Sequence, residues 1–259
     1  MFREDRKGLI VVEVENQDLI KTIQVKFPRL SKGQKLIAEY ILKHYDKAAF
    51  LTAAKLGSSV GVIDQESTLK SVLKSDMENI RYTLEKINHK TFDDVVDSIF
   101  SAKRIYILGL RSSTPIAEFL GFYLNLILDN AKIISYGVSD IFEQMMNVAK
   151  GDLVIGIGFP RYAARTIEAL DYAQNNEATV VAITDSLLSP LAARANHTLI
   201  AQSNMASFVD SLVAPLSVVN ALIIAVGLRE KDKISSTFSK LEHIWQEYEV
   251  YSYKERRRD

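Results

Sequence analysis

Three short apolar runs, each followed at once by glycine, hydroxyl residues or arginine, constrain the fold of this chain more than any other feature. They lie at residues 105–108, 153–157 and 180–183 of the sequence. Runs of this kind are typical of strands that are buried on both faces of a parallel sheet. Each run ends where a helix is expected to begin, and a helix start directs backbone N–H groups at anions. The pattern therefore predicts a site for a small phosphorylated metabolite.

Strands and helices alternate beyond residue 102. Short connections between them imply right-handed crossovers, so the predicted fold class is α/β, with a doubly wound five-stranded parallel sheet and helices on both faces. Ligands of such sheets bind beyond the carboxyl ends of the strands. The periodicity places strands near 104–108, 132–135, 153–157, 179–183 and 197–201, and helices near 113–129, 139–149, 161–175, 187–194 and 208–228.

Helical periodicity dominates the first hundred residues. Apolar residues recur at helical spacing from Leu19 to Leu56, which predicts a small all-helical domain over residues 1–62. The same spacing continues through residues 63–101 as a helical linker, and residues 102–259 form the α/β domain. Near the end of the chain, an amphipathic helix from Ile234 to Tyr248 is expected to pack on the core or on a second subunit.

Composition excludes several classes of protein. The chain has no cysteine, and its four histidines lack metal-ligand spacing, so neither disulfides nor a metal site are expected. No pairing of titratable residues indicates acid–base catalysis, and no cofactor is expected. The charged N-terminus lacks the apolar segment of a signal peptide, and the apolar stretch 212–228 falls short of a bilayer span, so the predicted location is the cytoplasm.

The loop after the first apolar run offers a turn glycine, a guanidinium and hydroxyls at the start of a helix. Arginine can clamp a phosphate through two hydrogen bonds, and hydroxyls can bind phosphate or sugar oxygens. The alternative is that the hydroxyls only cap the helix. The predicted effector contacts in this loop are Gly109, Arg111, Ser112 and Ser113.

Two further loops provide candidate contacts. After the second run these are Gly158, Phe159, Arg161 and Tyr162, although Arg161 could instead neutralise Glu168 or Asp185. After the third run the candidates are Thr184, Asp185 and Ser186, for which helix capping and ligand contact are equally compatible with the sequence.

The order of these motifs resembles a known family. Residues 102–228 are similar to a sugar isomerase (SIS) domain, and residues 19–62 are similar to the start of the helix-turn-helix head of RpiR-type transcriptional regulators. The resemblance implies a phosphorylated sugar as effector, with Ser112 and Ser113 in the hydroxyl loop of the first strand, and a homodimer or homotetramer. The stretches that carry it are 27–32, 37–42, 102–109, 158–162 and 182–186.

Two stretches depart from the family pattern. Residues 159–162, Phe-Pro-Arg-Tyr, replace the serine-rich turn of the isomerases, and such a loop resembles the regulator branch. By the family pattern, the head lacks its recognition helix after Val62, a gap of about forty to fifty residues by the usual size of such modules. Either the head is shortened, which the lack of the arginine and aromatic residues expected of a reading helix from Gln65 onward favours, or residues 66–70 replace that helix. Without that helix nothing reads base edges in the major groove. The remaining candidates for DNA contact are Lys32, Lys35, Lys55, Ser58 and Ser59.

Three functions are compatible with these features. The first is a sugar-phosphate-responsive transcriptional regulator of RpiR type, in which the SIS domain binds the effector and the head binds DNA. The second is a phosphosugar aldose–ketose isomerase, for which His197 or Glu143 would be the base. The third is an SIS protein that senses phosphosugars without binding DNA. The loop 159–162 favours the first over the second.

Overall fold

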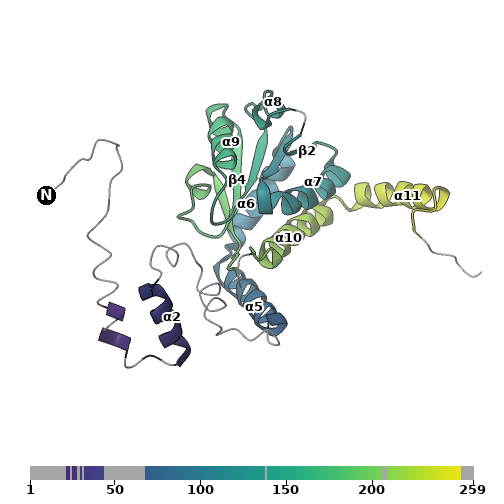
Figure 1. Cartoon of the computed structure of the whole chain (residues 1–259). Helices are drawn as coiled ribbons and strands as arrows, with labels where there is room; N and C mark the ends of the chain where they lie inside the picture. Colours follow the sequence, from purple (N-terminus) through teal and green to yellow (C-terminus); the bar gives the residue numbers. More distant parts are fainter. Residues whose placement is uncertain are drawn as a thin grey trace, which may run out of the picture. The chain divides into compact units, whose positions relative to one another are not determined.

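The computed structural model describes residues 22–23, 25–27, 30, 32–43, 68–137, 139–205 and 209–251 (Figure 1). The chain divides into two compact units. One consists of Met1–Leu73 with Met205–Val209, and the other of Lys74–Asn204 with Asp210–Asp259. In the first unit the helix α2 spans Lys32–Lys43, and its Ala38 is buried. The expected helix near Leu51 to Leu56 lies outside the described residues.

The second unit is built on a parallel sheet of five strands in the order β2-β1-β3-β4-β5, so the predicted fold class is confirmed. Every residue of β1 and β3 is buried, which explains why apolar and polar residues do not alternate along these strands. The strands are β1 (Ile105–Gly109), β2 (Ala131–Ile134), β3 (Leu153–Ile157), β4 (Thr179–Thr184) and β5 (His197–Ile200).

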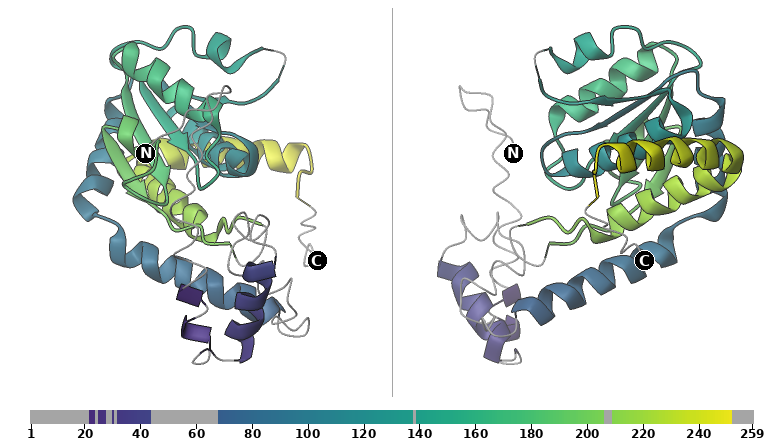
Figure 2. Two further views of the ribbon diagram at one scale, coloured as in Figure 1. Left: turned by 60° about the vertical axis from the view of Figure 1, so that its left-hand side comes forward. Right: turned by 90° about the vertical axis from the view of Figure 1, so that its right-hand side faces the viewer.

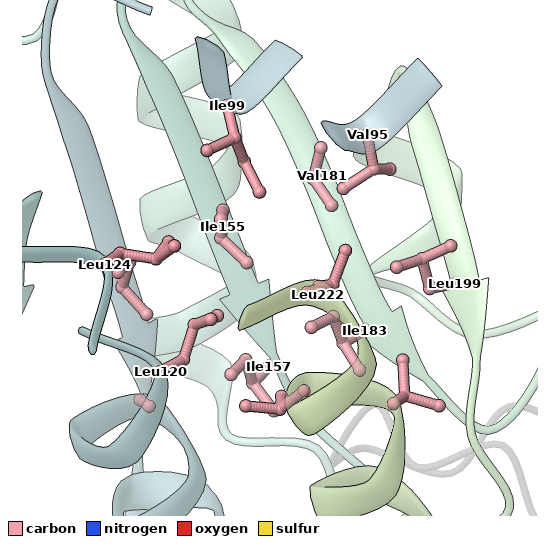
Figure 3. Close-up of a cluster of buried hydrophobic side chains, with 14 of the residues drawn as sticks. Val95, Ile99, Leu120, Leu124, Ile155, Ile157, Val181, Ile183, Leu199 and Leu222 are labelled. Carbon is pink, nitrogen blue, oxygen red and sulfur yellow. The ribbon is translucent and has the colours of Figure 1, made fainter. Parts of the chain in front are cut away.

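Helices cover both faces of the sheet, and Figure 2 shows the sheet between the two layers. The helices on one face are α6 (His89–Ser101), α7 (Thr114–Leu128) and α10 (Val213–Arg229), and those on the other are α8 (Ile141–Gln144) and α9 (Ala164–Asn175). Alternate strand residues supply the two cores, because successive side chains of a strand point to opposite faces. Ile155 and Val181 pack with Ile99 of α6 on the first face (Figure 3), whereas Val154 and Val180 belong to the second core.

Two long helices flank this domain. The first, α5 (Thr68–Lys86), lies within the predicted linker and is followed by α6, where the Asn88 side chain accepts the N–H of Thr91 as an N-cap. The second, α11 (Lys231–Glu247), is the amphipathic helix expected at the end of the chain. In the part of the chain that the structure describes, no single helix is long and apolar enough to cross a membrane. The pair α10 and α11 reaches that length only together, with a bend of 102° between them.

Two predicted helices are shorter than expected. The helix predicted at 139–149 ends at Gln144, because the Asp152 carboxylate accepts the N–H of Ala149 and shapes the following residues into turns. The helix predicted at 187–194 is reduced to the 3₁₀ turn η4 (Ala192–Arg194). There the hydroxyls of Ser186 and Ser189 accept the N–H groups of Leu188 and Ala192, which offers the backbone an alternative to a helix.

Candidate functional site

The carboxyl ends of β1, β3 and β4 lie side by side at one edge of the sheet. Gly109 pairs with Ile157, and Ile157 pairs with Ile183, so the three loops that leave these strands are neighbours. From β1 the chain crosses through α7 to β2 on one side, and from β3 it crosses through α9 to β4 on the other. The edge between β1 and β3 is therefore the topological switch point, where ligands of open α/β sheets bind.

The first loop forms the 3₁₀ turn η3 (Arg111–Ser113) between β1 and α7. Arg111 is exposed and has a φ of 60°, a left-handed backbone that a non-glycine residue rarely adopts. Gly109 allows the tight turn, because a Cβ at this position would lie 2.8 Å from the carbonyl oxygen of Ser113. Non-glycine residues in this conformation concentrate at ligand-binding sites.

The second loop repeats this geometry after β3. Arg161 is exposed and has a φ of 65°. Gly158 donates its N–H to the carbonyl of Ile183 at 3.1 Å, which fastens the loop to β4. Phe159, one of the predicted effector contacts, is 5% exposed and packs in the core on the side of α6, α7 and α10, so its side chain anchors the loop from below.

The helices that start at this edge have no side-chain caps. Within the described ranges, Ser113 is the N-cap residue of α7 but makes no capping hydrogen bond, and the N-cap of α9 is Ala163, which has no polar side chain. Elsewhere in the domain α6 is capped by Asn88, and α8 by a reciprocal pair of Asp140 and Glu143. The first-turn N–H groups of α9 thus have no side-chain acceptor, which is an arrangement that binds anions. At the start of α7, Thr114 donates its N–H to the carbonyl of Arg111 and Pro115 has no N–H, so this start offers fewer free amides.

Neither arginine of the two loops is neutralised by a carboxylate. Among the residues that the structure describes, Arg111 and Arg161 take part in no salt bridge, whereas Glu168 pairs with Arg165. The same edge also carries the carboxylates of Asp185 and Asp210, so its charge is mixed and the two guanidinium groups are local positive sites within it. The edge can attract a phosphate and bind it in more than one place.

The second and third loops are joined by Asp185. Its Oδ1 accepts hydrogen bonds from the Tyr162 hydroxyl at 2.7 Å and from the Thr184 hydroxyl at 3.2 Å. Burial, and then the hydrogen bond to Asp185 and its negative charge, raise the pKa of Tyr162 above its usual range. The Tyr162 hydroxyl therefore stays protonated and continues to donate its hydrogen bond to Asp185. The hydroxyl of Ser186 accepts the N–H of Leu188 at 3.1 Å, which is a contact to the local backbone of the kind that capping residues make.

Asp210 belongs to this edge although no sequence motif points to it. Its Oδ2 accepts a hydrogen bond of 2.6 Å from the hydroxyl of Ser112, 98 residues away in the chain. It stands shortly before α10, in a connection with no strand-end or glycine signal. Only the fold brings it to the first loop.

The residues considered for DNA contact and for isomerase chemistry do not belong to these three loops, although Glu143 lies in the connection that leaves the carboxyl end of β2. Lys35 and Lys32 belong to α2, and Lys55, Ser58 and Ser59 lie outside the described residues. His197 is the first residue of β5 and so lies at the amino edge of the parallel sheet, opposite the three loops. Glu143 accepts the backbone N–H of Asp140 at 3.0 Å in the cap of α8. In the described part of the chain, no group of three or more His, Cys, Asp or Glu side chains is arranged to hold a metal ion.

Comparison with known proteins agrees with this architecture. The profile of the SIS domain family matches residues 98–225. The sugar isomerase domain of an RpiR transcription factor from Sphaerobacter thermophilus is 28% identical and has a TM-score of 0.66, with coverage of 68% of this chain and 99% of that domain. The Vibrio vulnificus NanR protein complexed with ManNAc-6P shares the fold at 18% identity and a TM-score of 0.58, covering 87% of this chain and 98% of its own.

Some relatives known from sequence are named as transcriptional regulators, and others, from Paraburkholderia and Burkholderia, are named bifunctional protein glk and match at 26–27% identity over a quarter of their own length. An uncharacterized HTH-type regulator of Haemophilus influenzae is 24% identical over 189 residues, which is 68% of this chain and 63% of the relative. A second, from Caldanaerobacter subterraneus, is 23% identical, and the match spans 62% of its length. The HTH-type transcriptional regulator HexR of Escherichia coli K12 is 22% identical over 285 residues, covering 89% of this chain and 95% of HexR.

Proposed function

We propose, from the SIS domain that residues 98–225 form and that RpiR-type regulators also carry, that the chain is a sugar-phosphate-responsive transcriptional regulator. The observation that carries the proposal is the pair of unpaired arginines, Arg111 and Arg161, beside two uncapped helix starts at one sheet edge. Backbone N–H groups and guanidinium groups that converge in this way select a phosphate.

Each loop has a separate role in the proposed complex. Arg111 and Arg161, with the amides of the α7 and α9 starts, bind the phosphate of the effector. The hydroxyl of Ser112 donates to a phosphate oxygen, as in the hydroxyl loop of related domains. Tyr162 and Asp185 lie on the β4 side of the edge and contact the hydroxyls of the sugar, because a carboxylate accepts hydrogen bonds that a sugar donates. Thr184 is fully buried, so its role is to hold Asp185 through the hydrogen bond from its hydroxyl.

We further propose that the protein acts on DNA in the cytoplasm as a homodimer or homotetramer. Two heads held at a fixed spacing match two half-sites, and an effector that changes this spacing changes DNA affinity. The candidate contacts are Lys32, Lys35, Lys55, Ser58 and Ser59. The alignment with HexR runs over 285 residues, more than the 259 of this chain, so HexR has residues with no counterpart here. That difference supports a shortened head.

Thermal-shift measurements with a panel of sugar phosphates test the effector site. The expected result is a higher melting temperature with one or more phosphorylated sugars and no change with the unphosphorylated sugars. A ligand at a hundred times its dissociation constant adds about 2.7 kcal/mol to the free energy of unfolding, which is readily detected. An unchanged melting temperature across the panel contradicts the proposal.

A DNA-binding assay at low salt separates the regulator from a protein that only senses metabolites. The fragments should include the promoter upstream of the gene for this chain, with and without the effector found above. Effector-dependent binding supports the regulator, whereas effector binding with no DNA binding identifies a sensor. Conversion of an aldose phosphate to a ketose phosphate, followed by NMR, would establish the isomerase instead.

A further inference from the structure

The hydroxyl of Ser112, which the proposed function assigns to the effector phosphate, is already in use. It donates to Oδ2 of Asp210 at 2.6 Å. A serine hydroxyl has a single proton to donate, so Ser112 cannot donate to Asp210 and to a phosphate oxygen at once. The contact is also charge-assisted, and such hydrogen bonds are the stronger ones.

We propose that the Asp210 carboxylate competes with the effector phosphate for the hydroxyl of Ser112, and that displacement of Asp210 transmits effector binding to the rest of the domain. The inference rests on the proposed effector site. A carboxylate on Ser112 stands where the phosphate must bind, and two anions that share one donor repel each other. Phosphate binding therefore requires Asp210 to leave Ser112, and a ligand without an anionic group has no means of displacing it.

Displacement of Asp210 is passed on through its neighbour in the chain. The hydroxyl of Ser211 donates to Oδ1 of Asp76 on α5 at 2.6 Å, and its carbonyl accepts the hydroxyl of Ser203 at 2.8 Å. Asp210 and Ser211 share one peptide link, so a displacement of Asp210 that involves the backbone also perturbs the bond between Ser211 and Asp76.

The segment that follows β5 is fastened to α5 at two more places. Asn79 donates to the carbonyl of Asn204 at 3.0 Å and accepts its N–H at 3.1 Å. The hydroxyl of Thr83 accepts the N–H of Gln202 at 2.8 Å. Asn79 is 1% exposed and Thr83 is 6% exposed, so these polar groups are buried and costly to leave unpaired. α5 is thus the element that responds to Asp210, and it continues as one helix to Thr68, within the N-terminal unit.

The first test measures binding of inorganic phosphate and of glucose 6-phosphate by calorimetry, in chloride buffer, for the full-length chain. Two variants, Asp210→Asn and Asp210→Ala, remove the competing charge. Both are expected to bind phosphate about tenfold more tightly than the original protein, within the usual range of coupling between sites. The matched control is Asp93→Asn, an equal loss of charge at an exposed position on α6, which should leave the affinity unchanged.

The outcomes separate the two proposals. Phosphate binding by the original protein with no gain in either Asp210 variant overturns the competition and leaves the effector site standing. No phosphate or glucose 6-phosphate binding by any of the proteins overturns the effector site and the competition together. Gain in the Asp93→Asn control as well would show a general effect of charge and would also overturn the inference.

The second test needs no ligand. Amide hydrogen exchange of Gln202 and Asn204, whose N–H groups are donated to Thr83 and Asn79, is followed by NMR in the original protein and in Asp210→Ala. The inference predicts severalfold faster exchange in Asp210→Ala, and the same change in the original protein when phosphate is added. Identical exchange in the two proteins, at equal melting temperatures, would show that Asp210 is not linked to α5.

Discussion

At the scale of single residues, Arg111 and Arg161 define the site by conformation as well as by charge. Each follows a strand within a few residues, each has a positive φ, and each is exposed. A left-handed backbone costs a non-glycine residue of the order of 1–2 kcal/mol. Glycine would be the less strained choice at both positions, and Asp129 and Glu177 have the same backbone conformation outside the three loops. The proposed phosphate contact gives a reason for arginine at positions 111 and 161.

Replacement of either arginine should weaken effector binding. Arg111→Ala and Arg161→Ala each remove a charge-assisted hydrogen bond of about 1.5–3 kcal/mol, so the affinity for a phosphorylated sugar should fall by about 10- to 100-fold. Calorimetry gives the affinities. Arg229→Ala is the matched control, because this arginine is at the C-terminal end of α10, pairs with Asp97 of α6 and should leave binding intact. Equal losses in all three variants would mean that net charge, and not the two loops, governs binding.

Tyr162 should stabilise the fold in a pH-dependent way. Its pKa is raised in the folded state, by burial first and then by Asp185, so the protonated form is the one that the fold favours. Its contribution is present below the ordinary tyrosine pKa of about 10 and is lost as the pH rises beyond it. Tyr162→Phe should therefore lower the free energy of unfolding by about 0.5–1.5 kcal/mol at pH 7.

Urea unfolding of the original protein and of Tyr162→Phe from pH 7 to pH 11 checks this, since the difference between the two proteins isolates Tyr162. The difference should be constant up to about pH 10 and should shrink above it. A difference that vanishes between pH 7 and pH 9 would contradict the assigned direction.

At the scale of elements, the strands define the site because they pack without polar interruptions. Gly156 lies within β3, where an added Cβ would lie 2.7 Å from Cδ2 of Leu170 on α9. α9 thereby approaches β3 closely, and this contact sets the position of the helix start beside Arg161. The position of the α9 start therefore depends on the packing of Leu170 against Gly156.

Gly156→Ala should destabilise the domain. Overpacking of a closed contact costs about 1–3 kcal/mol, because Leu170 is fully buried and cannot move aside freely. Chemical denaturation measures the loss. Gly137→Ala is the matched control, since a Cβ there would have no atom within 4 Å and should leave the free energy of unfolding nearly unchanged. A similar loss in both variants would place the cost in the backbone and not in the contact with α9.

What the sequence could predict follows from the range of the interactions involved. The strand at 153–157 was predicted with the bounds that β3 has, because an apolar run is a local signal. α8 was predicted too long, since its end depends on the Asp152 carboxylate, which lies beyond the helix in the chain. Arg111 was identified by its place after a strand, whereas the bond between Ser112 and Asp210 spans 98 residues and leaves no local pattern.

At the scale of the whole molecule, an apolar surface remains on α10 and α11. Ile224 and Leu228 are 61% and 60% exposed and lie one turn apart on α10, and Phe238 and Ile244 of α11 are also exposed. Exposed apolar residues grouped in this way are typical of surfaces that associate. The proposed homodimer or homotetramer would cover them.

Light scattering coupled to gel filtration should give a mass that is a multiple of the 29.1 kDa of the chain. The double variant Ile224→Lys with Leu228→Lys should shift this mass toward the single chain, because two buried lysines would be strongly unfavourable in the interface. Leu188→Lys, at a residue that is 95% exposed in the loop after β4, should not change it. A single-chain mass for the original protein would contradict the proposed assembly.

The bare starts of α7 and α9 have a practical consequence for anyone who handles this protein. At the proposed site, sulfate or inorganic phosphate in a purification buffer would bind in place of the effector and raise the free energy of unfolding with the logarithm of the anion concentration. A metabolite screen run in phosphate-buffered saline would then report weaker hits, since the buffer anion competes with the metabolite for the site. Chloride salts are the appropriate choice, because sulfate, phosphate and carboxylates all bind at helix N-termini.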